Sequence, residues 1–67
     1  MRDEDARPFA DSTTRRKVTL KSGVILDGSL SRADHGIYNV MPLPDLSGVV
    51  QGGLVRDIQV EDIVAIA

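Results

Sequence analysis

The chain of 67 residues contains no cysteine and a single histidine, His35. The absence of cysteine excludes disulfide bonds, thiol chemistry and cysteine-based zinc sites, and one histidine is too few for a histidine-based metal cage. A chain this short buries only about 60% of the surface that its unfolded form exposes, so an additional source of stability is usual at this size. With disulfides and bound metals set aside, we expect this source to be association with further copies of the chain.

Aromatic residues and long apolar runs are also scarce. Phe9 and Tyr38 are the only aromatic side chains, and no apolar segment approaches the roughly 18 residues of a membrane span. We expect no contact with a membrane, no signal peptide and a cytoplasmic location, because no apolar segment follows the charged first residues. The net charge of −2 argues against a strongly basic nucleic-acid-binding module, whereas the 42% of hydrophobic residues indicates a folded domain.

The first part of the chain contains little that can be buried. Phe9 is its only large apolar side chain after Met1, and Pro8 interrupts any helix at that point. We therefore expect residues 1–15 to form a flexible tail, with at most one short helical turn. Residues 16–67 are expected to form the folded domain.

The charges are distributed unevenly between these two parts. Residues 1–17 carry five basic and four acidic side chains, whereas residues 18–67 carry three basic and six acidic ones. The only basic cluster is Arg15-Arg16-Lys17. A cluster of this size is more typical of a solvated strand end than of a contact with RNA phosphates.

From Val18 onward the hydrophobic pattern indicates short strands rather than helices, because no segment keeps a 3.6-residue period over three turns. The polar pair Glu61-Asp62 separates the last two strands and is long enough for one 3₁₀ turn. The five expected strands cover residues 18–20, 24–33, 37–41, 49–60 with an interruption at 52–53, and 63–66.

Glycine residues mark the places where these strands turn or bend. Gly23 and Gly36 stand in the first two turns, where glycine adopts a positive φ at low cost. Gly28 lies in the middle of the longest strand, where a glycine usually marks a bend or a close approach of another backbone. Five short strands with such corners predict an all-β fold, a small and strongly bent five-stranded barrel of the SH3-like kind.

Two motifs resemble those of a known family. The spacing Val18-x-Leu20-x-x-Gly23-x-x-x-x-Gly28-x-Leu30-x-x-x-Asp34 resembles the first motif of the Sm/LSm proteins, a family that also includes the bacterial Hfq branch. The second motif of that family reads Ile-Arg-Gly-Asn-x-Ile-Arg-x-Ile. Residues 58–66 carry apolar residues at the same offsets, with Gln59-Val60 in place of Arg-Gly. A competing register starts at Val55 and keeps Arg56 as the motif arginine.

The resemblance implies an Sm-like barrel that forms a homo-oligomeric ring and binds single-stranded RNA, rich in U or A, at the ring pore. In the family, the fourth strand of one subunit pairs with the fifth strand of the next. The residues that the resemblance places at this interface are Leu54, Ile58, Val60, Ile63 and Ile66. The residues that it places near the RNA are Asp34, His35, Tyr38, Asn39 and Arg56.

Each of these candidates also has a structural interpretation. Asp34 suits a turn whose carboxylate accepts from backbone N–H groups, Tyr38 suits core packing with its hydroxyl at the rim, and Asn39 suits a strand end. The alternative function is a structural or adaptor barrel that oligomerises and binds a protein partner without nucleic acid. We expect no enzymatic activity, no cofactor and no metal site, because no phosphate-binding loop or nucleophile–base set is present.

Overall fold

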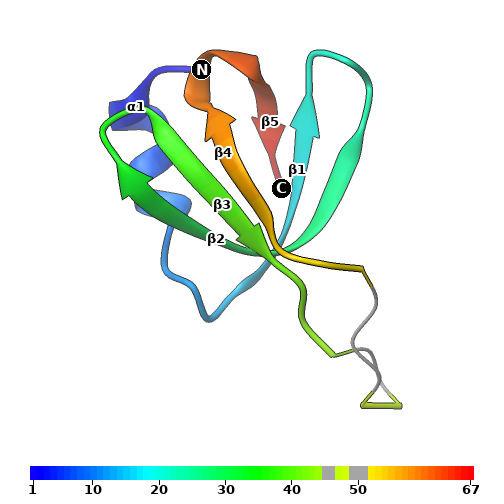
Figure 1. Cartoon of the computed structure of the whole chain (residues 1–67). Helices are drawn as coiled ribbons and strands as arrows, with labels where there is room; N and C mark the ends of the chain where they lie inside the picture. Colours follow the sequence, from blue (N-terminus) through cyan, green and yellow to red (C-terminus); the bar gives the residue numbers. More distant parts are fainter. Residues whose placement is uncertain (45–46, 49–51) are drawn as a thin grey trace.

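The computed structural model describes residues 1–44, 47–48 and 52–67. About half of these residues belong to strands, and the short helices lie near the start of the chain and before the last strand (Figure 1). In chain order the elements are α1 (Asp3–Ala6), the 3₁₀ helix η1 (Arg7–Phe9), β1 (Arg15–Leu20), β2 (Ile25–Asp34), β3 (Ile37–Met41), β4 (Val55–Gln59), the 3₁₀ helix η2 (Val60–Asp62) and β5 (Ile63–Ile66). The predicted small all-β fold with five strands is confirmed.

The five strands form one antiparallel sheet in the order β4-β3-β2-β1-β5. In a flat sheet, four strand spacings of about 4.8 Å would separate the two outer strands by about 19 Å. The three residues of η2 connect these outer strands directly, and a 3₁₀ helix rises only about 2 Å per residue. The sheet must therefore curl to bring its outer strands toward each other, and Figure 1 shows this curvature.

The strand β2 holds the two halves of the sheet together. Gly28 pairs with Arg16 of β1, and the next residues along β2 pair with β3, as Leu30 does with Val40. A Cβ atom placed on Gly28 would overlap the Met41 carbonyl oxygen and lie 2.9 Å from the carbonyl carbon. The predicted close approach of backbones at this glycine is confirmed, and it explains why no side chain is accommodated there.

The core lies on the concave face of the sheet. Val18 stands between Leu26 and Ile66 in the β2-β1-β5 register, so the three side chains form one inward row. The fully or nearly fully buried apolar residues are Ala6, Val18, Leu30, Tyr38, Val40, Ile58 and Ile63. They come from every strand and from α1, so the sheet and the N-terminal helix share one core.

The N-terminal segment packs against this core, which differs from the flexible tail expected for residues 1–15. Ala6 is fully buried, Phe9 packs at the edge of the core, and the Arg16 guanidinium lies 5.0 Å from the centre of the Phe9 ring. The Asp3 side chain is buried as well. The lack of large apolar side chains favoured a flexible tail, whereas the small residue Ala6 and the carboxylate of Asp3 anchor this segment.

Further differences concern the ends of strands, because β1 begins at Arg15 rather than at Val18 and β2 covers Ile25–Asp34 rather than residues 24–33. The fourth strand was expected over residues 49–60. The structure gives β4 as Val55–Gln59, Val60 lies in η2, and residues 49–51 fall outside the described part. The predicted 3₁₀ turn around Glu61-Asp62 is confirmed as η2. Among the described residues, none of the helices has the length and apolar character needed to cross a membrane.

Candidate functional site

The turn between β2 and β3 contains two of the predicted site residues, Asp34 and His35. The His35 backbone N–H donates to Asp34 Oδ1 at 2.7 Å, so this carboxylate stabilises its own turn. Gly36 has a φ of 72°, which favours glycine. Its carbonyl oxygen accepts from the Val60 N–H at 2.9 Å. The β2–β3 turn and the start of η2 therefore lie against each other at one end of the sheet.

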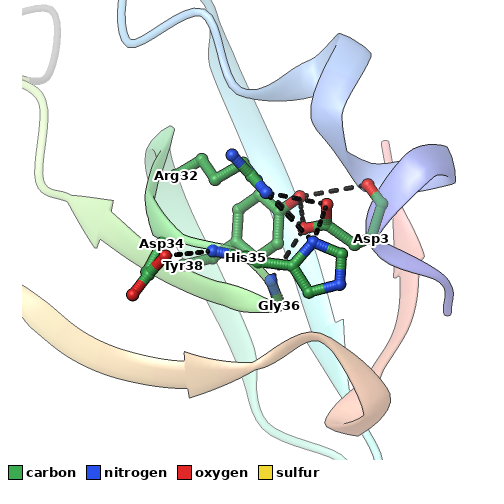
Figure 2. A network of polar contacts seen from close by, with 6 residues as sticks. All are labelled: Asp3, Arg32, Asp34, His35, Gly36 and Tyr38. Carbon is green, nitrogen blue, oxygen red and sulfur yellow. Dashed lines mark hydrogen bonds and ion pairs between the residues drawn. The ribbon is translucent and has the colours of Figure 1, made fainter.

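Beside this turn, the Asp3 carboxylate is surrounded by hydrogen-bond donors from the sheet (Figure 2). Arg32 Nε donates to Oδ1 at 3.1 Å and Arg32 Nη2 to Oδ2 at 3.0 Å. The Gly36 N–H donates to Oδ1 at 2.9 Å, and the Tyr38 hydroxyl donates to the same oxygen at 2.7 Å. Asp3 is only 9% exposed, so the carboxylate exchanges most of its water contacts for these four bonds.

These contacts fix the charges of the cluster. The hydrogen bond from Arg32 holds the pKa of Asp3 well below its usual range, and the Tyr38 hydroxyl and Gly36 N–H act in the same direction against the effect of burial. Burial raises the pKa of Tyr38 to about 12, and the neighbouring Asp3 carboxylate adds to this shift. At neutral pH the cluster therefore contains a carboxylate, a guanidinium and a neutral phenol.

His35 lies at the exposed edge of the same cluster. Its side chain is 84% exposed. Nδ1 lies 3.3 Å from Arg32 Nη2 and 3.4 Å from Asp3 Oδ2. A guanidinium can only donate and a carboxylate can only accept, so Nδ1 faces a donor and an acceptor at once. Figure 2 shows Nε2 pointing away from the cluster, so a ligand can approach this nitrogen. The side chains that line a cleft of about 360 Å³ at this place are Arg2, Asp3, Glu4, Arg7 and His35.

The structure contradicts one of the predicted RNA contacts. Tyr38 is fully buried, and its hydroxyl donates to Asp3. Its ring therefore has no free face on which a base could stack. The sequence leaves two interpretations of this residue open, and core packing is correct because Asp3 supplies a buried acceptor for the hydroxyl.

Asn39 and Arg56 occupy paired strands, away from the turn. Arg56 and Asp57 both stand opposite Asn39, because the register shifts between the pairs Tyr38↔Ile58 and Val40↔Val55. The Asn39 side-chain oxygen accepts from the Asp57 N–H at 3.2 Å, and Asp57 has a positive φ of 60°. Asn39 thus stabilises a β-bulge. Arg56 is exposed on the edge strand and lies closer to this bulge than to His35.

Two of the three residues in the basic cluster are engaged within the molecule. Arg15 Nη1 lies 2.9 Å from Asp27 Oδ1, and Arg15 Nη2 donates to the Pro44 carbonyl oxygen at 2.6 Å. Arg16 Nη2 lies 3.7 Å from Asp11 Oδ2. Both guanidinium groups therefore contact other parts of the same chain, whereas the sequence indicated a solvated strand end.

The predicted interface residues divide into two groups. Ile58 and Ile63 are buried in the core of the single chain, so their side chains are not available to a neighbouring subunit. Val60 and Ile66 are half-buried, and Leu54 is exposed. In the single chain the side chains of Ile58 and Ile63 belong to the core, and the backbones of β4 and β5 form the two outer edges of the sheet.

In the described part of the chain, no group of three or more His, Cys, Asp or Glu side chains could hold a metal ion. Comparisons with protein-family models, with curated proteins and with solved structures found no match to this chain. The function is therefore inferred from the sequence motifs and from the contacts described above.

Proposed function

We propose that the protein is an Sm-like barrel that assembles with copies of itself into a ring. The observation that carries this proposal is the position of β4 and β5 at opposite edges of the sheet, each with only one partner strand among the described residues. An exposed strand edge presents unpaired N–H and C=O groups. Pairing of β4 in one copy with β5 in the next would satisfy both edges.

The order of the elements supports the Sm-like part of this proposal. The resemblance implies five strands with a 3₁₀ turn between the fourth and the fifth, and η2 lies between β4 and β5. The motif glycine Gly28 stands where two backbones approach closely. The contact between two different edges is heterologous, so it closes into a ring when the rotation between neighbours permits.

Two functions remain for such a ring. Binding of single-stranded RNA at the β2–β3 turn is favoured by the exposed ring of His35, whose Nε2 a base or a phosphate can approach. An adaptor function without RNA is favoured by the acidic domain and by an apolar cleft of about 360 Å³, beside which Ile25 is 61% exposed. Tyr38 and Asn39 are used inside the molecule, so the adaptor function requires fewer further assumptions.

The assembly is tested by measuring the mass of the purified chain with light scattering at micromolar concentration. Val64 lies on the edge strand β5 and is 59% exposed, so Val64→Lys should place a charge on the joining edge and reduce the mass to that of a single chain. Val24 is 49% exposed and lies outside the strands, so Val24→Lys is the matched control and should leave the mass unchanged. A wild-type chain that is monomeric would refute the ring.

RNA binding is tested with labelled oligo-U at about 50 mM salt, where phosphate contacts are strongest. Stacking on a side chain contributes about 1–3 kcal/mol per base, so His35→Ala should weaken binding by about 5-fold or more. Lys21→Ala, in the β1–β2 turn, tests for a non-specific effect of lost charge. An assembled ring that binds no RNA under these conditions would leave the adaptor function as the proposal.

A further inference from the structure

The donors around Asp3 form a complete receptor for a carboxylate. Arg32 presents two parallel N–H groups, which match the two oxygens of a carboxylate. Gly36 adds a backbone N–H and Tyr38 adds a hydroxyl. All three residues belong to β2, β3 and their turn, whereas Asp3 belongs to α1. The receptor is thus part of the sheet, and the carboxylate is delivered by a separate segment.

We propose that Arg32, Gly36 and Tyr38 form a carboxylate-binding site, which Asp3 occupies in the free chain and which an acidic segment of another chain can occupy after displacing residues 1–10. This carboxylate-binding site requires neither ring formation nor RNA binding. Residues 1–10 act as an internal competitor for this site.

Such an exchange requires the N-terminal segment to leave the sheet as one unit. Helix α1 has only four residues and no side-chain cap, and isolated helices of fewer than about 12 residues are marginal in water. Asp3 and Ala6 are its two buried residues. The segment joins β1 through an exposed loop in which Ser12 has a strained positive φ of 54°. Besides the Asp3 cluster, the buried Ala6 and the packing of Phe9 hold the segment. The Met1 ammonium also donates to the Ile63 carbonyl oxygen at 3.1 Å. A competing segment must replace these contacts as well.

The internal ligand also indicates what a competing ligand must contain. Asp3 and Ala6 are three residues apart in one helical turn, so both point toward the sheet. The carboxylate meets the donors, and the fully buried methyl group fills the adjacent part of the core. A matching ligand carries an aspartate followed three residues later by a small apolar residue.

Occupancy of this site is linked to the β2–β3 turn. The Gly36 N–H and the Arg32 side chain bond to the carboxylate, and the same Arg32 contacts His35 Nδ1. Loss of the carboxylate would leave the buried Tyr38 hydroxyl and the Gly36 N–H without their acceptor. The exposed His35 ring would then lose the contact that orients it.

The first experiment uses the full chain with the internal ligand removed. Asp3→Ala is titrated with sodium acetate at pH 7 and constant ionic strength, and the thermal midpoint and the NMR signal of the Gly36 amide are recorded. We expect a saturable rise of the midpoint and a saturable shift of the Gly36 signal. Wild type should show neither response, and Asp5→Ala is the matched control because Asp5 is exposed on the same helix. Should Asp3→Ala fail to fold, Asp3→Ser replaces it.

The second experiment tests the ligand pattern. A peptide with the sequence of residues 1–10 is added to the Asp3→Ala chain, and a peptide with alanine at its third position is the control. Binding of the first peptide at least 10-fold tighter than the second supports the proposal. Equal binding of both peptides, binding of neither, or an acetate response that is the same in Asp3→Ala and Asp5→Ala would overturn it.

Discussion

The substitution Gly28→Ala tests the arrangement of β1, β2 and β3 most directly. The added Cβ would overlap the Met41 carbonyl oxygen, and it would lie 2.9 Å from the carbonyl carbon and 3.1 Å from Val40 Cγ1. Carbon atoms in favourable contact are about 3.5–4.0 Å apart. The backbones of β2 and β3 would therefore have to separate by at least about 0.6 Å.

Such a separation is costly because β2 is held on both sides. Gly28 pairs with Arg16 of β1, so β2 cannot move away from β3 without disturbing the second ladder. Overpacking of a well-packed site costs about 1–3 kcal/mol, and weakened ladder hydrogen bonds add about 1 kcal/mol each. A domain of this length has a total stability of about 3–10 kcal/mol. We therefore expect Gly28→Ala to lose at least about 3 kcal/mol.

Urea unfolding followed by circular dichroism measures this loss. Gly53→Ala is the matched control, because no atom of the described residues lies within 4 Å of a Cβ placed there and no positive φ is found. This control should be neutral, or more stable by about 0.4–1 kcal/mol through reduced freedom of the unfolded chain. Equal unfolding midpoints for Gly28→Ala and Gly53→Ala would refute the close approach of β2 and β3.

Three further predictions concern the buried polar contacts. Tyr38 is the only tyrosine, so ultraviolet absorbance at alkaline pH should report its ionisation near pH 12. Asp3→Asn should move the pKa of Tyr38 toward the ordinary value of about 10. An ordinary pKa of Tyr38 in the folded wild type would contradict the Asp3 contact. The pKa of Asp3 is lower in the folded chain than in the unfolded one, so the stabilising effect of its carboxylate is complete above about pH 4–5 and is lost as the pH falls further. The free energy of unfolding should therefore depend less on pH in the acid range for Asp3→Asn than for wild type. Identical acid unfolding profiles of the two chains would argue against this role of Asp3. Asn39→Ala removes the acceptor of the Asp57 N–H and should cost about 1 kcal/mol in urea unfolding, whereas an unchanged midpoint would show that the bulge does not need this bond.

The strands and their turns could be predicted because their signals are local. Alternation of apolar residues, glycines in turns and the polar break before the last strand depend on neighbours within a few residues. The close approach at Gly28 could be predicted for the same reason, since a glycine inside a long strand usually marks a bend or a neighbouring backbone. The predicted fourth strand is too long, because Leu54 and Val60 match the alternating pattern as well as the residues of β4 do.

The Asp3 cluster could not be predicted, because it joins residues about 30 positions apart. Neither Asp3 nor its small partner Ala6 stands out in a polar N-terminal segment. One signal is present in the sequence: Arg32 follows Leu26 and Leu30 on the inward side of the alternating β2 pattern. A cation at the end of an apolar face needs a buried or half-buried partner, and only the fold reveals that this partner comes from α1.

The role of Tyr38 depends on the same contact. A tyrosine beside a turn suits either base stacking or core packing, and its neighbours in the sequence do not distinguish the two. Asp3 distinguishes the two, because its carboxylate accepts a hydrogen bond from the Tyr38 hydroxyl inside the protein and so allows the whole ring to be buried. Candidate sites that are inferred from residue type alone are least secure where a distant residue can satisfy the polar group.

The strand order has a consequence for the speed of folding. The pairs β1–β2, β2–β3 and β3–β4 join consecutive strands, whereas β5 must return across the sheet to β1, as in the pair Val18↔Ile66. Closing a loop of nearly fifty residues costs more chain entropy than forming a hairpin. We therefore expect the hairpins to form first and the docking of β5 to be the late step, so that the edge proposed to join neighbouring copies is completed last.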